Sequence, residues 1–274
     1  MFRRLTPALV LSLAAFSLTD LARSQSPELD FNKLSLVFRE DFDLDLSVSP
    51  WGPNTRWIAH TPWHGDFGDA QFVDPRPGFP FTVSDGMLRI EARKNGNGKW
   101  ESGLLSSADE NGYGFSLKYG YFEMRAKLPP GPGVWPAFWL ATVADKTRPP
   151  VAGLEIDVLE YYGHNPVAYQ TVAHLWEPDG KENRETGYTP HQISVLPDQL
   201  TKDFNTFGVM VTPEWIVFYL NRREVARDKT APEHQRPLHI LLDLALGSGF
   251  PIDKTRNPSY MYVDYVHAYK FLHD

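Results

Sequence analysis

The sequence predicts an all-β protein, a sandwich or jelly roll of two antiparallel sheets. Apolar and polar side chains alternate with a period of two residues in about ten short stretches, which is typical of strands that bury one face. Turn-forming residues separate these stretches, and most of the 23 prolines fall in the connections. Because no linker, repeat or low-complexity tract divides the chain, we expect residues 25–274 to form a single domain.

Residues 1–24 have the pattern of a secretory signal peptide. A basic start (MFRR) precedes a short apolar core (LTPALVLSLAAFSL), and the small residues that a signal peptidase prefers follow in LARSQS. The apolar core is too short to span a bilayer, and no later segment is longer. We therefore expect a secreted or periplasmic protein that is not embedded in a membrane.

Charge and cysteine content exclude several classes of function. The chain carries 27 Lys and Arg against 34 Asp and Glu, a net charge of −7. Removing residues 1–24 takes away three arginines and one aspartate, which leaves 24 basic and 33 acidic side chains and a net charge of −9. This balance argues against nucleic acid or an anionic membrane as a partner. The absence of cysteine excludes disulfides, thiolate nucleophiles, Cys-ligated zinc and a lipid anchor on cysteine.

The expected strands follow one another along the chain. The alternation is clearest in residues 118–128, where one face is apolar (Phe122, Met124, Ala126 and Leu128) and the other carries Tyr121, Glu123, Arg125 and Lys127. The same period recurs in four further stretches: 86–94 after a turn at Ser84–Gly86, 213–225 with a hairpin turn at NRR, 237–247 and 261–271. Only residues 196–203 (LPDQLTKD) look like a short helix.

The stretch GLEIDVLEYYG, residues 153–163, contains three acids that do not fit a regular strand. Glu155 and Asp157 share one face, but residue 159 is Leu and the third acid, Glu160, comes one place late. A β-bulge near Val158–Leu159 would insert one residue and return Glu160 to the face of the other two acids. The spacing therefore predicts such a bulge.

Three carboxyl groups on one face of a strand can divide the work of cleaving a glycosidic bond. Two glutamates can supply a nucleophile and a general acid, while the middle acid hydrogen-bonds one of them. Like charges this close cannot all ionise, so at least one carboxyl should stay protonated near neutral pH. The alternatives are a solvated strand face or a calcium site, but the interleaved apolar residues and the following tyrosines fit the floor of a cleft better. The spacing alone does not decide between a retaining and an inverting reaction.

The segment LEIDVLEYYG resembles the E-x-D-x-x-E signature, with its bulge, of glycoside hydrolase family 16, the laminarinase and lichenase family. Further stretches resemble the family's successive strands in the same order: SGLLSS, KYGYFEMRAKLPPGPGVWPAFWLA, HLWEPDG, PEWIVFYLNRREV, LLDLALG and MYVDYVHAYK. Together they cover about residues 35–272. The resemblance implies a concanavalin-like jelly roll and a retaining double displacement. It assigns Glu155 as nucleophile, Asp157 as assisting acid and Glu160 as general acid/base.

Five aromatic or histidine side chains are candidates for binding a sugar chain. His174 and Trp176 share a strand face and would lie beside the acids, where the family commonly has a histidine; a lone histidine can also be structural. Trp135 and Trp139 share a face and resemble the family's stacking rings, although tryptophan in a strand is as often core. Trp63 belongs to a long aromatic segment, Pro53–Pro75, that either borders the cleft or is an ordinary surface crossover. The polar residues 177–192 are expected to form a mobile rim.

Two departures from the family's usual pattern bear on the substrate. Leu104 and Leu105 follow SG where many laminarinases carry a basic or polar residue, and the usual LAVGG.W is LALGSGF here, with Phe250. These changes leave the fold and the chemistry in place. They leave the identity of the polymer open among β-1,3-glucans, mixed-linkage glucans, exopolysaccharides and galactans.

The resemblance also implies a structural calcium ion far from the cleft. Asp264, on the last strand, and Gly86, near the first hairpin, match the positions that hold it in family members, and oxygen ligands suit calcium. Asp264 can equally be a solvated strand residue. We expect no cofactor in the chemistry.

The sequence thus favours an exported endo-β-glycosidase that acts on a polysaccharide as a monomer. Two other functions stay open: a transglycosylase, which differs only in the acceptor, and a carbohydrate-binding protein that has lost catalysis. The intact acid triplet favours an enzyme, because a binding protein does not need a protonated carboxyl.

Overall fold

The computed structural model describes residues 29–143, 152–183 and 188–272. The predicted signal peptide, residues 1–24, lies outside the described residues and stays a prediction. Within the described ranges, no helix is long and apolar enough to cross a membrane.

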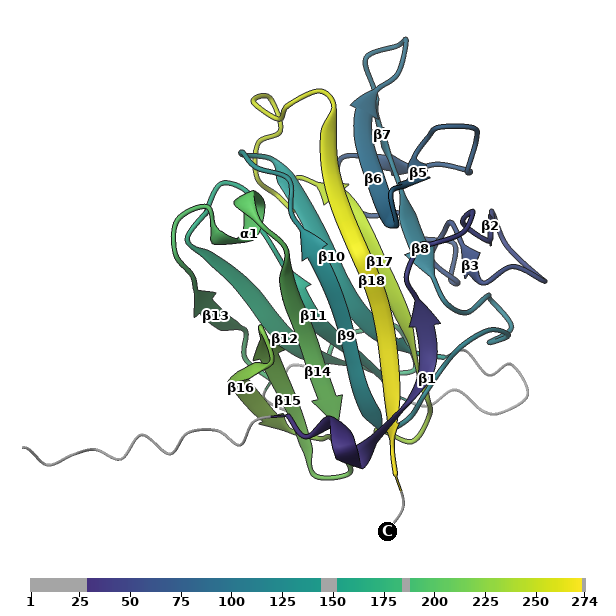
Figure 1. Cartoon of the computed structure of the whole chain (residues 1–274), viewed down its shortest axis with the longest axis vertical. Coiled ribbons are helices and arrows are strands. Elements are labelled where there is room, and N and C mark those ends of the chain that lie inside the picture. Colours follow the sequence, from purple (N-terminus) through teal and green to yellow (C-terminus); the bar gives the residue numbers. More distant parts are fainter. Residues whose placement is uncertain (1–28, 144–151, 184–187, 273–274) are drawn as a thin grey trace, which may run out of the picture.

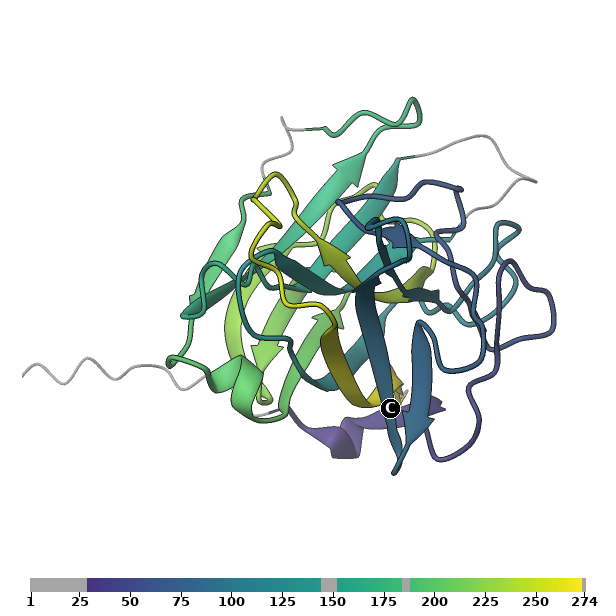
Figure 2. The same cartoon turned by 90° about the horizontal axis from the view of Figure 1, so that it is seen from above.

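The described strands form two sheets that pack face to face (Figures 1 and 2). The first sheet follows the order β16-β15-β14-β9-β18-β6-β7-β4, with β1 added to β18 and β5 to β6. Its strands are β1 (Leu34–Glu40), β4 (Gln71–Phe72), β5 (Phe81–Ser84), β6 (Met87–Lys94), β7 (Trp100–Ser102), β9 (Gly120–Lys127), β14 (Asn205–Val211), β15 (Trp215–Leu220), β16 (Arg223–Lys229) and β18 (Ser259–Phe271).

The second sheet follows the order β13-β12-β11-β10-β17-β8-β3-β2. Its strands are β2 (Val48–Ser49), β3 (Trp57–Ile58), β8 (Leu104–Ser106), β10 (Val134–Thr142), β11 (Gly153–Glu160), β12 (Ala168–Trp176), β13 (His191–Ser194) and β17 (Leu238–Leu246). Two short helical turns complete the described elements: η1 (Phe31–Lys33) and α1 (Gln199–Lys202), the latter inside the predicted helix. The predicted jelly-roll sandwich is therefore confirmed.

Nearly all strand pairs are antiparallel, as the alternation predicts. The exceptions are β2 with β3 and β4 with β7, which run parallel. All four are short strands of two or three residues. Because no tight hairpin joins either pair, the two strands of a pair need not run in opposite directions.

The core lies between the two sheets and takes the side chains that the alternation assigned to it. Phe122, Met124 and Ala126 of β9 are fully buried, and they belong to the same apolar cluster as Phe138 and Leu140 of β10. The opposite face of the second sheet is also largely covered, and it carries the acids. The pleat of β10, β11, β12 and β17 thus separates a dry core from a second face that is available for chemistry.

The predicted β-bulge in β11 is present. Asp157 pairs with Val172 and Glu160 pairs with Gln170, so three steps along β11 match two along β12. The register also shifts against β10. The two side chains at the bulge, Val158 and Leu159, are buried in the core cluster. Because the bulge absorbs one residue, Glu160 returns to the face of Glu155 and Asp157.

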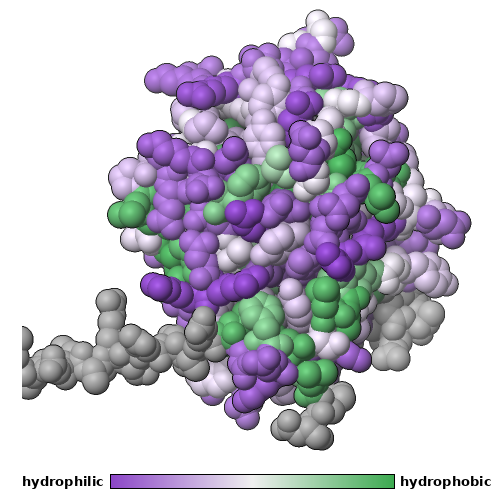
Figure 3. Space-filling view, in the orientation of Figure 1, coloured by the Kyte–Doolittle hydropathy of each residue, from purple (hydrophilic) through white to green (hydrophobic). Residues whose placement is uncertain are grey.

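The outer face of the first sheet is mostly hydrophilic (Figure 3), and the charged side chain of Glu123 is fully buried within it. Glu123 of β9 is fully buried and accepts hydrogen bonds from Tyr121 (2.6 Å), Tyr265 (2.9 Å) and Arg222 (2.9 Å). Gly208 of β14 makes room for the Tyr121 ring, because a Cβ there would lie 2.2 Å from the Tyr121 hydroxyl oxygen. A glycine in mid-strand is needed here to keep the Glu123 hydrogen bonds intact.

We therefore expect Gly208→Ala to lower the free energy of unfolding by about 1–3 kcal/mol, because the buried Tyr121 ring must move and Glu123 loses a partner. Urea denaturation measures the change. Gly96→Ala is the matched control: it lies in the turn between β6 and β7, and its Cβ would meet no atom within 4 Å. Equal stability of the two variants would contradict the prediction.

Candidate active site

Two adjoining hollows lie on the outer face of the second sheet and contain all three predicted acids. One is lined by Trp63, Phe67, Trp135, Ala137, Trp139, Glu155, Asp157, Glu160 and His174. The other is lined by Trp63, Ala141, Thr142, Gly153, Leu154, Glu155, Trp176 and Gly180. Since both share Trp63 and Glu155, they form one continuous groove, and the five predicted sugar-binding residues all line it.

Glu155 lies in the middle of the groove with one oxygen held. The Trp176 indole nitrogen donates a hydrogen bond to Glu155 Oε2 at 3.1 Å, which leaves Oε1 open to the groove. Burial and the neighbouring Asp157 raise the pKa of Glu155 to about 8. His174 and the Trp176 hydrogen bond act in the opposite direction and favour its charged form.

Glu160 has the same arrangement on the other side. Its Oε1 accepts hydrogen bonds from the Trp135 indole (3.1 Å) and from the Tyr162 hydroxyl (2.9 Å). Because both donors reach the same oxygen, a proton on this carboxyl must sit on Oε2. Burial, with the charge of Asp157, raises the pKa of Glu160 to about 7. A carboxyl with this pKa holds a proton near neutral pH, as a general acid requires.

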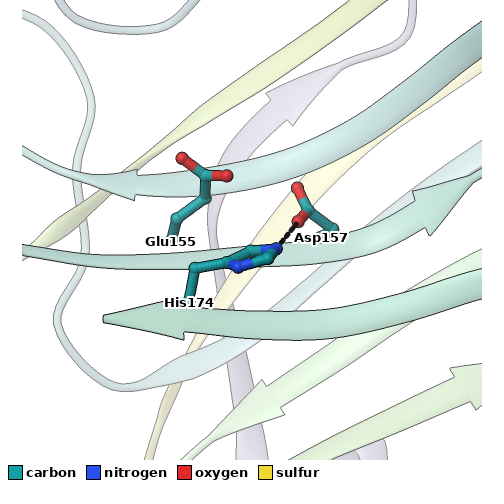
Figure 4. Close-up of side chains that lie close together, drawn as sticks. All are labelled: Glu155, Asp157 and His174. Carbon is teal, nitrogen blue, oxygen red and sulfur yellow. Dashed lines mark ion pairs between the residues drawn. The ribbon is translucent and has the colours of Figure 1, made fainter. Parts of the chain in front are cut away.

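Asp157 and His174 form an ion pair beside Glu155 (Figure 4). His174 Nε2 lies 3.2 Å from Asp157 Oδ2, and its Nδ1 lies 2.7 Å from Glu182 Oε1. Although burial opposes a charge on the ring, the bond to Asp157 and the two further carboxylates raise the pKa of His174 to about 9. His174 is therefore an imidazolium that donates through both nitrogens.

Glu155, Asp157 and His174 are also the group of described side chains whose polar atoms come close enough to hold a metal ion, within 4.8 Å of one another. A histidine that ligates a metal must offer a lone pair. Both nitrogens of His174 face carboxylates instead, so this site suits a protonated ring better than a metal.

The tryptophans of β10 bind different acids. Trp135 donates to Glu160, whereas Trp139 is 5% exposed and donates from its indole nitrogen to Asp243 at 2.9 Å. Trp63 is 51% exposed, and its ring meets the edge of Trp139 with centroids 5.8 Å apart. Trp63 and Trp135 thus offer ring surface to a ligand, while Trp139 forms the floor beneath them.

The sequence did not identify three residues of this groove. Asp243 of β17 is fully buried and lies beside Trp139, and a charged residue in the middle of an apolar nine-residue strand is a signal that would have found it. Phe67 packs edge-on against Trp135 and Trp139. Glu182 lies in the segment that the sequence assigned to a rim, and no pattern in that segment singles it out.

A further hollow lies next to Glu160, because Tyr162, which donates a hydrogen bond to Glu160, is one of its lining residues. It is lined by Tyr162, His164, Asn165, Ala168, Tyr169, Gln170, Gln192, Ser248 and Phe250. Phe250, one of the two departures from the family pattern, packs on His164 with ring centroids 3.8 Å apart. The other departure is apolar and out of reach of solvent: Leu104 lies beneath the groove and Leu105 lies in the core.

The predicted calcium site gains no support from the residues around it. Asp264 forms an ion pair with Arg125 on the outer face of the first sheet, so its carboxylate is already neutralised. Gly86 lies in the turn between β5 and β6, next to the Asp43 carboxylate. The calcium ion stays a prediction, and no step of the chemistry depends on it.

Comparisons with known proteins agree with this geometry. The sequence profile of the glycosyl hydrolases of family 16 matches residues 79–267. Endo-1,3-1,4-beta-glycanase EglC of Rhizobium meliloti (strain 1021) is 32% identical over 270 residues, which is 90% of this chain and 54% of that protein. Glucan endo-1,3-beta-glucosidase A1 of Niallia circulans is 27% identical over 270 residues, 86% of this chain and 38% of that protein. The chain thus spans about half the length of these relatives, or less.

The fold has close counterparts among solved structures. The laminarinase catalytic domain from Thermotoga maritima MSB8 superposes with a TM-score of 0.68 at 23% identity, and the match covers 88% of this chain and all of that one (100%). This likeness shows the jelly-roll fold.

Asp243 makes a testable contribution to stability. Burial raises its pKa from 3.8 to about 8, so between these values the folded protein keeps a proton that the unfolded chain has lost. The free energy of unfolding due to this group therefore falls as the pH rises through that window, by up to about 1.4 kcal/mol per pH unit.

Asp243→Asn removes this titration but keeps an oxygen that accepts a hydrogen bond. We expect its stability, relative to the unsubstituted protein, to rise between about pH 5 and about pH 7 with the slope just given. Urea denaturation at both pH values measures the difference. A difference that does not change with pH would show that Asp243 titrates near its ordinary value.

Proposed function

Because the chain belongs to the glycosyl hydrolases of family 16, we propose that it is an endo-acting β-glucan hydrolase that cleaves by a retaining double displacement. The observation that carries this proposal is the way in which hydrogen bonds hold the carboxyl groups of the two glutamates. Each has one oxygen fixed by an indole N–H, Glu155 by Trp176 and Glu160 by Trp135. Each therefore presents its second oxygen in a defined direction.

Glu155 is the proposed nucleophile. Its held oxygen, Oε2, fixes the carboxylate plane, and Oε1 attacks the anomeric carbon to form a glycosyl-enzyme. The imidazolium of His174 stands close by and favours the ionised carboxylate that attack requires.

Glu160 is the proposed general acid and base. In the first step, the proton on Oε2 passes to the leaving glycosidic oxygen. In the second step, the same carboxylate takes a proton from water, which then attacks the glycosyl-enzyme and releases the sugar with its original configuration. The hydrogen bonds from Trp135 and Tyr162 stabilise Glu160 while it is ionised between the two steps.

The lining of the groove favours an uncharged polysaccharide. Aromatic rings (Trp63, Phe67 and Trp135) provide the apolar surface on which pyranose rings stack. Glu155, Asp157 and Glu160 place negative charge on its floor, which repels sulfate or uronate groups. We therefore place a neutral β-1,3- or mixed-linkage glucan ahead of an acidic exopolysaccharide or a sulfated galactan. A binding protein without catalysis has no use for raised pKa values at both glutamates, so the site favours an enzyme.

Substitution of each glutamate tests the proposal. Glu155→Gln and Glu160→Gln should each lower reducing-sugar release from laminarin or mixed-linkage glucan by about 10³-fold or more. Glu214→Gln, an exposed glutamate in the turn between β14 and β15, is the control and should retain full activity. Cleavage that survives in Glu155→Gln would overturn the assignment.

Azide separates the two roles. In Glu155→Ala, azide enters the space of the missing carboxylate and attacks an aryl β-glycoside directly, which gives the α-glycosyl azide. In Glu160→Ala, azide attacks the glycosyl-enzyme from the opposite face and gives the β-azide. Product configuration by NMR distinguishes them, and the reversed outcome would exchange the roles of Glu155 and Glu160.

Tyr162 provides a test by pH. Because activity requires a proton on Glu160, whose pKa is raised, the rate should fall on the alkaline side of the pH profile as that proton is lost. The Tyr162 hydroxyl stabilises the ionised form, so Tyr162→Phe should raise the Glu160 pKa and move the alkaline limb of kcat/KM to higher pH by up to about 1 pH unit. Tyr161→Phe is the control, since that neighbouring ring is buried in the core. An unmoved or lowered limb in Tyr162→Phe would contradict the prediction.

A further inference from the structure

We propose that Glu182 is a positioning residue of the active site: it fixes the His174 ring, and through His174 it holds Asp157 between the two glutamates. The proposal concerns this chain's own segment after β12, and it rests on the proposed function. Glu182 faces Nδ1 of His174, and Nε2 of the same ring faces Asp157, so the route by which Glu182 acts on the site runs through His174.

The chain builds a small hairpin that delivers Glu182 to this place. Backbone hydrogen bonds join Glu177 to Lys181 (2.7 Å), Gly180 to Glu177 (2.9 Å) and Asn183 to Leu175 (2.7 Å). Residues 176 and 182 form an antiparallel β-bridge, so the chain folds back after β12 and Glu182 pairs with the end of that strand. The Glu182 side chain thereby reaches His174, two residues before the bridge on the opposite limb. A carboxylate held by backbone pairing has a defined position, which a residue on an unstructured rim would not have.

The geometry at His174 depends on both of its partners. Nδ1 lies 2.7 Å from Glu182 and Nε2 lies 3.2 Å from Asp157, so each ring nitrogen faces a carboxylate. Two acceptors on opposite sides of the ring fix its orientation and require a proton on each nitrogen. All three side chains are mostly buried, so solvent screens this pairing only weakly.

The charge that Glu182 stabilises acts on the reacting groups. The titratable groups that act on His174 are Asp157, Glu155 and Glu160 from β11 and Glu182 from the hairpin. The imidazolium is the positive charge among them. Without Glu182, the Nδ1 proton loses its acceptor and the neutral ring becomes accessible at lower pH. Asp157 then loses a charged partner, and Glu155 loses the positive charge that favours its ionised form.

A separate hollow beside Glu182 and His174 allows their contact to be tested independently. A space of about 290 Å³ is lined by Ala173, His174, Leu175, Glu182, Asn183 and Tyr188. Truncation of Glu182 would enlarge this space next to Nδ1, where a small carboxylate such as formate can replace the missing group.

The experiment compares Glu182→Gln with Asp179→Asn. Both remove one negative charge from the same hairpin, but Asp179 is exposed and pairs with Lys181 rather than with His174. The first readout is the pKa of His174 from the pH dependence of its imidazole NMR signals, which His174→Gln assigns. We expect this pKa to fall by about 1–3 pH units in Glu182→Gln and to stay unchanged in Asp179→Asn.

The second readout is kinetic. On the glucan that the unsubstituted protein cleaves best, Glu182→Gln should lower kcat by about 10- to 100-fold, the loss of one hydrogen bond to a charged group, with KM changed by less than about twofold. Formate should restore part of kcat in Glu182→Ala and none in Glu155→Ala. Rescue of this kind separates the loss of one carboxylate from a general disturbance of the hairpin.

The outcomes separate the two proposals. An unchanged His174 pKa in Glu182→Gln, or an equal change in Asp179→Asn, would overturn the role of Glu182. A loss of activity without a change of pKa would likewise reduce Glu182 to a structural residue. If the unsubstituted protein cleaves no glucan, the proposed function fails, but the NMR titration still decides whether Glu182 holds His174 as an imidazolium.

Discussion

The constraint on which the site depends is the repulsion among carboxyl groups held together on one dry sheet face. Glu155, Asp157 and Glu160 come from six consecutive positions of β11, and β17 adds Asp243 nearby. In water such a group would ionise fully, but in a site of low dielectric each further charge is opposed both by burial and by its neighbours. The residues around the acids supply hydrogen-bond donors and one positive charge, which make it possible to hold these carboxyl groups so close together.

Tryptophan N–H groups and the imidazolium of His174 offset this repulsion by stabilising the carboxylates. Trp176, Trp135 and Trp139 donate to Glu155, Glu160 and Asp243, respectively. A tryptophan suits this task because its ring closes the floor of the groove while its N–H satisfies one carboxylate oxygen. A lysine would supply more charge, but it would neutralise the acids outright and leave no ring face for a sugar. Among the described residues that line the groove, His174 alone carries a full positive charge, and this charge pairs with Asp157, the acid that is not proposed to change its bonds.

The sequence predicts those features that depend on periodicity and misses those that depend on where a loop returns. The strands follow from the two-residue alternation, and the bulge follows from the single broken phase between Asp157 and Glu160. His174 and Trp176 follow from the next strand by the same rule. Trp57 and Trp63 show the limit of this reasoning: both lie in one aromatic segment without alternation, yet Trp57 is fully buried in the core and Trp63 is half exposed above the groove. Glu182 is similar, because its contact with His174 is created by a hairpin that local composition does not specify.

The raised pKa values of both glutamates bear on how a bound substrate would complete the proposed reaction. In the free protein, burial and like charges raise the pKa of both glutamates, that of Glu155 to about 8 and that of Glu160 to about 7, and the proposed reaction needs the proton on Glu160. Two acids that share one proton titrate as a pair, and a small change in their surroundings moves the proton from one to the other. Positive charge that develops at the anomeric carbon beside Glu155 favours the ionised form of that carboxylate. The leaving oxygen beside Glu160 needs the same proton that Glu155 gives up. The transition state of the proposed reaction therefore favours the form with Glu155 ionised and Glu160 protonated, and part of the barrier is lowered by interactions that the ground state does not make.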